Sequence, residues 1–217
     1  MPAEPATFVF ADIAGFTALT EAHGDEHAAA VIDEFGAKVD AALPPGATRV
    51  KTIGDAVMLR VPEPAEAIHL GLRIAASAEH GAAAVRVGLH HGEAIERDGD
   101  YFGAAVNLAA RVASVAVGGE VLTTGATAAL VPDLTGVLYE SRGRQTLRNI
   151  REPVDLFAVL PLGDTAGDRL PIDPVCGMAV DPDRSPGRLS YEGTTYFFCS
   201  LTCAGDFAGD PDRFTSS

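Results

Sequence analysis

The chain has 217 residues, 47% of them hydrophobic, and a formal net charge of −14. Its apolar content is sufficient for a packed core and excludes a largely disordered chain. The negative charge argues against a nucleic-acid partner, because a protein neutralises a phosphate backbone with a basic face. A nucleotide substrate stays compatible with this charge, since a few local cations and a bound metal can neutralise it.

The sequence predicts neither a membrane segment nor a secretion signal. No apolar run approaches the roughly 18 residues that a membrane helix requires. The start, Met1-Pro2-Ala3-Glu4-Pro5, lacks the basic residues and the apolar stretch of a signal peptide. We therefore expect a cytoplasmic protein without a membrane partner. The three cysteines all follow position 170, and in a reducing compartment such a cluster indicates metal binding more than disulfides.

Strand and helix patterns alternate through the first 160 residues. In chain order they predict a strand over 7–11, a helix from Thr17 to about Ala42, a hairpin of strands 48–53 and 56–61 around the turn Gly54-Asp55, a helix over 64–80, a strand over 84–90, a helix over 103–117, and short strands near 121, 137 and 156–159. The order β-α-β-β-α-β predicts an α+β fold with a ferredoxin-like sheet and helices on one face.

The composition changes near residue 163. We predict a first domain over 1–162, a linker rich in Gly, Asp and Pro over 163–171, and a small second domain over 172–217. The second domain contains all three cysteines together with several aromatic residues. A domain this small rarely has a hydrophobic core large enough to fold without additional stabilisation, for example by a bound metal ion.

Three motifs stand in order along the first domain. They are Phe-Ala-Asp-Ile-Ala-Gly-Phe-Thr at 10–17, Lys-Thr-Ile-Gly-Asp at 51–55, and Asp-Tyr-Phe-Gly-Ala-Ala-Val-Asn-Leu-Ala-Ala-Arg at 100–111. In this order and spacing they resemble the catalytic domain of class III nucleotide cyclases, and the resemblance covers roughly residues 5–160. It implies an adenylate cyclase, which converts ATP into 3′,5′-cyclic AMP and pyrophosphate.

The resemblance assigns a two-metal centre to the first two motifs. Asp12 and Asp55 would hold two Mg²⁺ or Mn²⁺ ions per active site, and the backbone carbonyl of Ile13 would add a ligand. The residue chemistry agrees, because Asp12 ends a buried strand and Asp55 lies at a hairpin turn, where two carboxylates can converge. Oxygen ligands suit these ions, which would bridge triphosphate oxygens. Taken singly, either residue could also be an ordinary turn aspartate.

The remaining site residues are implied by the same resemblance. Lys51 and Asp100 match the pair that reads adenine, the lysine donating to N1 and the aspartate accepting from N6. Asn107 would orient the ribose and Arg111 would stabilise the transferring phosphoryl group; four residues apart on a helix, they share one face. Arg148 lies where the family often has a basic residue that contacts the terminal phosphates.

In this family one subunit supplies the metal-binding aspartates and the other supplies the purine and transition-state residues. A chain that carries the whole set is therefore expected to form a symmetric homodimer with two shared sites.

Two neighbouring histidines, His90 and His91, are interpreted as structural, because they lie on a strand next to a glycine.

The second domain resembles a YHS domain, a small metal-binding module, over about residues 172–214. The motifs are Asp-Pro-Val-Cys-Gly-Met at 173–178 and Tyr-Phe-Phe-Cys-Ser-Leu-Thr-Cys at 196–203. A helical turn that begins near Ser200 would bring Cys199 and Cys203 together near Cys176. Three thiolates suit Zn²⁺ or another thiophilic metal. The alternative is that these cysteines are small buried residues of an aromatic core.

The fourth ligand is not evident from the sequence. No histidine follows His91, so the domain itself offers only cysteine, carboxylate or water. The fusion of a catalytic and a metal-binding domain suggests that metal occupancy modulates the cyclase. Two alternatives stay open: a catalytically silent domain that only binds nucleotide, and a metal-handling protein that uses the cyclase fold as a dimerising scaffold for its metal-sensing tail.

Overall fold

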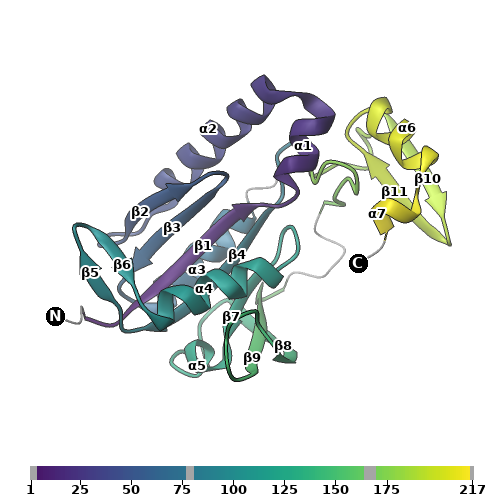
Figure 1. Ribbon diagram of the computed structural model, residues 1–217. Coiled ribbons are helices and arrows are strands. Elements are labelled where there is room, and N and C mark those ends of the chain that lie inside the picture. Colours follow the sequence, from purple (N-terminus) through teal and green to yellow (C-terminus); the bar gives the residue numbers. More distant parts are fainter. Residues whose placement is uncertain (1–3, 77–80, 164–169, 216–217) are drawn as a thin grey trace.

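The computed structural model describes residues 4–76, 81–163 and 170–215 (Figure 1). The elements are β1 (Ala6–Ile13), α1 (Phe16–His23), α2 (Asp25–Ala42), β2 (Thr48–Ile53), β3 (Ala56–Val61), α3 (Pro64–Ala75), β4 (Val85–Gly92), β5 (Ile95–Arg97), β6 (Asp100–Phe102), α4 (Ala104–Val115), β7 (Val121–Thr124), α5 (Gly125–Ala128), β8 (Val137–Gln145), β9 (Val154–Pro161), β10 (Gly187–Tyr191), β11 (Thr194–Phe198), α6 (Leu201–Gly209) and α7 (Asp212–Thr215). Within these ranges, none of the helices has the length and apolar character needed to cross a bilayer.

Seven strands form one sheet in the order β2-β3-β1-β4-β7-β9-β8. The central strand β1 is antiparallel to both β3 and β4, and β4 is parallel to β7. The first four strands in this order have the ferredoxin-like arrangement, so the predicted α+β fold is confirmed. The predicted hairpin is also present, since β2 and β3 pair around residues 54 and 55.

Helices cover both faces of the sheet, so the prediction of helices on one face was wrong. Side chains alternate between faces along a strand. On β1, Val9 and Ala11 pack in the same core cluster as residues of α2 and α3, whereas Phe8 and Phe10 pack against α4. The apolar run of β1 is the pattern of a strand buried on both sides. Helix α4 crosses β4 so closely that a Cβ at Gly88 would collide with the α4 backbone.

The long helix predicted from Thr17 to Ala42 is broken into α1 and α2. Gly24 separates them with φ 84° and ψ 164°, a conformation that only glycine adopts readily. As a result α1 ends at His23 and α2 leaves in a new direction (Figure 1). The first helix is preceded by Gly15, and Thr17 lies inside its first turn. Helix α3 ends at Ala75, and part of its predicted extent, residues 77–80, lies outside the described residues.

The second domain consists of the β10–β11 hairpin with α6 and α7, and it lies beside α1 (Figure 1). The two domains share a hydrophobic cluster in which Leu19 and Ala28 of α1 and α2 pack with Phe198 and Phe207. A short antiparallel contact reinforces this docking: the backbone of residues 81–84 exchanges hydrogen bonds of 2.8–3.0 Å with residues 177 and 179. Of the predicted linker, residues 164–169 lie outside the described part of the chain.

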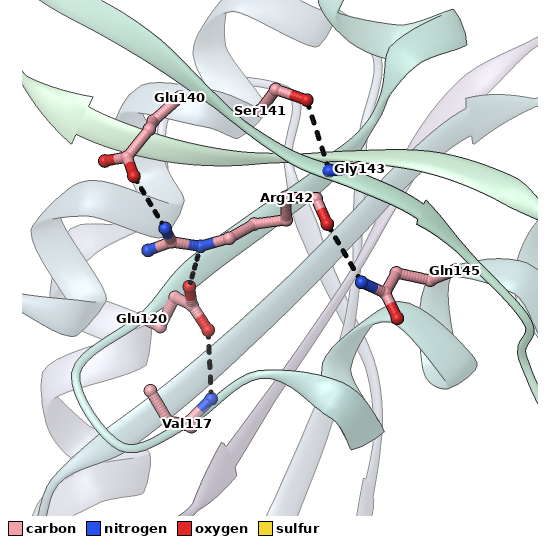
Figure 2. Close-up of polar contacts among 7 residues, drawn as sticks. All are labelled: Val117, Glu120, Glu140, Ser141, Arg142, Gly143 and Gln145. Atoms are coloured by element: carbon pink, nitrogen blue, oxygen red, sulfur yellow. Dashed lines mark hydrogen bonds and ion pairs between the residues drawn. The ribbon is translucent and has the colours of Figure 1, made fainter.

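A polar network attaches the β8–β9 arm to the start of β7 (Figure 2). Glu120 is buried, accepts a hydrogen bond from the Val117 backbone at 3.1 Å and pairs with Arg142 at 2.9 Å. The guanidinium also contacts Glu140 at 2.7 Å. Because a buried carboxylate is costly without partners, this network holds the arm in place and with it the loop that carries Arg148.

Candidate active site and candidate metal centre

The end of β1 and the β2–β3 turn bring Asp12 and Asp55 to the same edge of the sheet. Asp12 lies opposite Ala56 in the β1–β3 register, and the Ile13 backbone N–H donates to the Asp55 carbonyl at 3.4 Å. Asp12 is the single residue of β1 that is not buried. The predicted ligands Asp12, Ile13 and Asp55 therefore lie together in one subunit.

The electrostatics of this edge fit a bound cation. Burial and the neighbouring charge of Asp12 raise the pKa of Asp55. Arg86 Nε donates to an Asp12 carboxylate oxygen at 2.8 Å, and a second guanidinium nitrogen contacts the same oxygen. One cation thus already balances Asp12, whereas Asp55 has a destabilised charge. A divalent ion bridging the two carboxylates would relieve that destabilisation.

Lys51 and Asp100 bind each other directly, although they are 49 positions apart. The Lys51 ammonium donates to both carboxylate oxygens at 2.8 and 2.6 Å. One of these oxygens also accepts from the Tyr101 backbone at 2.8 Å. The hydrogen bond from Lys51 holds the pKa of Asp100 below its usual range. The hairpin β5–β6 thus brings Asp100 to Lys51 on β2.

A cavity of about 310 Å³ lies beside this pair. Its walls include Lys51, Phe102, Val106 and Asn107, which combine apolar surface with polar groups in the manner of a small-molecule site. Asn107 is exposed on the first turn of α4, and the partly exposed Arg111 follows one turn later. The structure therefore brings Lys51, which is bonded to Asp100, and the predicted ribose residue Asn107 to the walls of one cavity.

Arg148 stands on the exposed loop between β8 and β9. Its neighbour Leu147 is buried against Val112 of α4, so this loop borders the helix that carries Arg111.

The histidines of β4 have structural surroundings. His90 Nδ1 lies 2.8 Å from the Thr124 hydroxyl, and burial lowers the pKa of His90 to about 4.

The three cysteines of the second domain converge as predicted. Cys176 Sγ lies 3.4 Å from Cys199 Sγ, which lies 3.8 Å from Cys203 Sγ. Ser200 caps α6 by accepting a hydrogen bond from the Cys203 backbone at 3.1 Å, which places Cys203 on the first turn. Asp173 is fully buried and accepts a hydrogen bond from the Cys199 backbone at 2.8 Å.

A fourth potential ligand comes from the first domain, and the sequence did not reveal it. His23 Nε2 lies 3.5 Å from Cys199 Sγ, and the ligand atoms of His23 and the three cysteines all lie within 4.8 Å of one another. The second domain itself offers only cysteine, carboxylate or water, and the histidine comes from the first domain. No spacing signal could have found His23, because it lies 176 positions from Cys199.

Hydrogen bonds between neighbouring thiols and burial set the protonation states of this cluster. The hydrogen bond with Cys199 and burial raise the pKa of the Cys176 thiol far above its usual range, and burial raises the pKa of Cys203 to about 12. Burial lowers the pKa of His23, which favours the neutral imidazole that binds metals.

Comparison with known families agrees with this architecture. The family described as "Adenylate and Guanylate cyclase catalytic domain" matches residues 1–160, and the YHS domain family matches residues 172–217. The chain therefore belongs to the adenylate and guanylate cyclase family and carries a YHS domain after the catalytic domain. The fusion predicted from the sequence is confirmed.

Two curated relatives are each similar to part of the chain. A pH-sensitive adenylate cyclase of Mycobacterium tuberculosis is 34% identical over 162 residues, which are 72% of this chain and 41% of the relative. A copper-transporting P-type ATPase of Rhizobium leguminosarum is 37% identical over 54 residues, which are 25% of this chain and 6% of the ATPase. The chain thus spans less than half the length of either relative.

Solved cyclase structures share the fold. Adenylate cyclases of Trypanosoma brucei in their monomeric state superpose with a TM-score of 0.68 at 24% identity, covering 75% of this chain and 90% of theirs. The adenylyl cyclase CyaB of Pseudomonas aeruginosa gives 0.64 at 23% identity, covering 77% and 98%. A guanylate cyclase domain from Catenaria anguillulae in complex with GTP gives 0.66 at 20%, covering 74% and 98%.

We expect Asp55→Asn to raise the melting temperature of the metal-free chain at neutral pH. Because the pKa of Asp55 is raised in the folded state, its charge costs more there than in the unfolded chain. The gain should shrink as the pH falls toward the ordinary aspartate value of 3.8, where both states become protonated. Mn²⁺ should reverse the order of the two melting temperatures, since only the parent keeps both carboxylates.

Thermal unfolding in chelator and in Mn²⁺ measures both effects. The exposed Asp133 provides a matched control, and Asp133→Asn should melt like the parent in both conditions. A lower melting temperature of Asp55→Asn in chelator, or an equal response of both proteins to Mn²⁺, would contradict a metal site at Asp55.

Proposed function

We propose that this chain is an adenylate cyclase, which converts ATP into 3′,5′-cyclic AMP and pyrophosphate at sites shared between two copies. The observation that carries the proposal is the Lys51–Asp100 pair beside the cavity that Asn107 also lines. Adenine presents an acceptor at N1 and a donor at N6, which match an ammonium and a carboxylate held side by side. Guanine presents a donor at N1 and an acceptor at position 6, the reverse order.

The chemistry follows from the residues around this cavity. The ribose 3′-oxygen forms a bond to the α-phosphorus as the 3′-hydroxyl gives its proton to water. The bond between the α-phosphorus and the oxygen that bridges it to the β-phosphorus breaks, and pyrophosphate leaves. By resemblance to the family, Asn107 orients the ribose and Arg111 neutralises charge on the transferring phosphoryl group. Arg148 is proposed to contact the terminal phosphates. Mg²⁺ or Mn²⁺ on Asp12, Asp55 and the Ile13 carbonyl would supply charge stabilisation.

The placement of the two residue sets supports a homodimer. Asp55 lines a separate cavity of about 380 Å³ between α2 and the β2–β3 hairpin, and neither aspartate lines the cavity beside Lys51. The two proposed metal-binding aspartates of one subunit therefore do not line the proposed purine cavity of the same subunit. In a head-to-tail dimer, each site would combine the aspartates of one copy with Lys51 and Arg111 of the other.

Mixing two inactive variants tests the enzyme and the shared site together. With ATP and Mn²⁺ we expect the parent to form cyclic AMP, and Asp55→Asn and Arg111→Ala each to form almost none. An equal mixture should recover about a quarter of the parent activity, because half of randomly paired dimers are mixed and each has one intact site.

Asp133→Asn serves again as the control and should keep full activity. Substantial activity of Asp55→Asn alone would exclude the assigned metal site, and an inactive mixture would exclude a shared site. A parent that binds ATP as a folded dimer without forming product would instead support the silent nucleotide-binding scaffold.

The purine pair predicts the nucleotide preference. Lys51→Glu combined with Asp100→Cys replaces the pair with the residue types that guanylate cyclases of the family place there. Each mismatched hydrogen bond to a charged group costs about 1.5–3 kcal/mol, so we expect the ratio of kcat/KM for ATP to that for GTP to fall at least about 10-fold. Steady-state kinetics with both nucleotides measure the ratio, and an unchanged ratio would show that these residues do not read the base.

We also propose that metal bound to the YHS domain modulates the cyclase. Gly177 of that domain has φ 75°, and a Cβ there would lie 2.5 Å from the carbonyl oxygen of Ala14. Ala14 is two residues from Asp12, so a displacement of the YHS domain reaches the catalytic edge directly. This contact favours modulation over an independent metal-binding tail.

Buffered Zn²⁺ added at saturating Mn²⁺ should change the turnover of the parent but not that of Cys199→Ser/Cys203→Ser. Cyclic AMP formation measures both responses. The variant also reveals any inhibition by Zn²⁺ at the catalytic metal site, since that effect would be the same in both proteins. An equal response of parent and variant would exclude modulation through the cysteines.

A further inference from the structure

We propose that His23 of the cyclase domain is the fourth ligand of a closed Zn²⁺ site whose other ligands are Cys176, Cys199 and Cys203. The site would bridge the two domains, so that one ion ties the YHS domain to the end of helix α1. This inference concerns metal binding and does not depend on the proposed cyclase activity.

The spacing of the ligand atoms fits one tetrahedral ion. With bonds of about 2.3 Å to sulfur and about 2.0–2.1 Å to nitrogen, a tetrahedral Zn²⁺ holds neighbouring ligand atoms about 3.5–3.8 Å apart. The sulfur of Cys199 lies 3.4, 3.8 and 3.5 Å from the ligand atoms of Cys176, Cys203 and His23. The remaining distances among these four atoms stay within 4.8 Å. A set of three cysteines and one histidine is a common structural zinc site.

The fold holds His23 in this position from two sides. Leu19 lies four residues earlier on α1 and is fully buried in the cluster shared with the YHS domain. Residues four apart on a helix share a face, so His23 faces the same domain. Gly24 then ends the helix directly after His23. The ligand is therefore part of a packed interface and is not on a free loop.

The buried carboxylate of Asp173 is already engaged by backbone donors and does not replace His23. Asp173 accepts hydrogen bonds from the Val175 and Cys199 backbones, at 2.9 and 2.8 Å, one with each carboxylate oxygen. Both bonds hold the loops that carry Cys176 and Cys199. Asp173 thus acts as a positioning residue for the loops that carry these two cysteines. Such outer-shell partners typically change metal affinity 10–100-fold.

The comparison of His23→Ala with His27→Ala tests the proposal. Both changes remove an imidazole from the same helix pair, but only His23 belongs to the cluster of ligand atoms. In the full chain we expect the parent and His27→Ala to bind one Zn²⁺ with equal affinity, measured by competition with a chromophoric chelator. His23→Ala should bind Zn²⁺ at least about 10-fold more weakly, since a direct ligand is worth at least as much as an outer-shell partner.

The Co²⁺-substituted proteins provide a spectroscopic readout that a merely structural role would not change. The parent and His27→Ala should show the same tetrahedral d–d bands, and His23→Ala should show weaker or shifted bands. His23→Cys is the conservative variant, in case His23→Ala does not fold. It should restore tight binding and add thiolate charge-transfer absorption.

Two results would overturn the proposal. If His23→Ala matches His27→Ala in Zn²⁺ affinity and Co²⁺ spectrum, the YHS domain binds metal without the cyclase domain. If the parent binds Cu⁺ but no Zn²⁺, and the His23 variants bind it equally, the site is a three-thiolate copper site. Neither measurement uses cyclic AMP formation, so failure here is distinguishable from failure of the proposed enzyme.

Discussion

The structure depends on the burial of β1 on both faces. Seven of its eight residues are buried, and it pairs with β3 on one side and β4 on the other. The exception is Asp12, which is near the end of the strand, where the packed layers stop. A carboxylate at that position needs a cation, and Arg86 or a bound metal can provide the charge. The same constraint that builds the core therefore places the candidate metal site at this edge of the sheet.

The segment after β1 connects that edge to the second domain. The chain turns through Ala14 and Gly15 into α1, and the YHS domain packs on this turn through Gly177. Helix α1 spans eight residues, or about 12 Å, so one short helix separates His23 from the edge of the sheet that carries Asp12. A shared hydrophobic cluster and backbone hydrogen bonds keep the two domains in contact. Both candidate metal sites are thus joined by one short segment of the chain.

The two candidate sites differ in the ions they select. Carboxylate and carbonyl oxygens at Asp12, Asp55 and Ile13 suit hard ions such as Mg²⁺ and Mn²⁺. Thiolates and an imidazole suit Zn²⁺ or Cu⁺. Ligand chemistry therefore separates the two candidate sites, because each set of ligand atoms favours a different class of ion.

Local pattern in the sequence determined much of this protein. The motifs at 10–17, 51–55 and 100–111 identified the cyclase family, and the Gly54-Asp55 turn and the Ser200 cap arose from short-range preferences. Tertiary structure decided that α4 covers the opposite face of the sheet from α2 and α3, and that His23 meets the cysteines. The physical reason is range: periodicity and capping act within a few residues, whereas a contact across 176 positions exists only once the two domains dock.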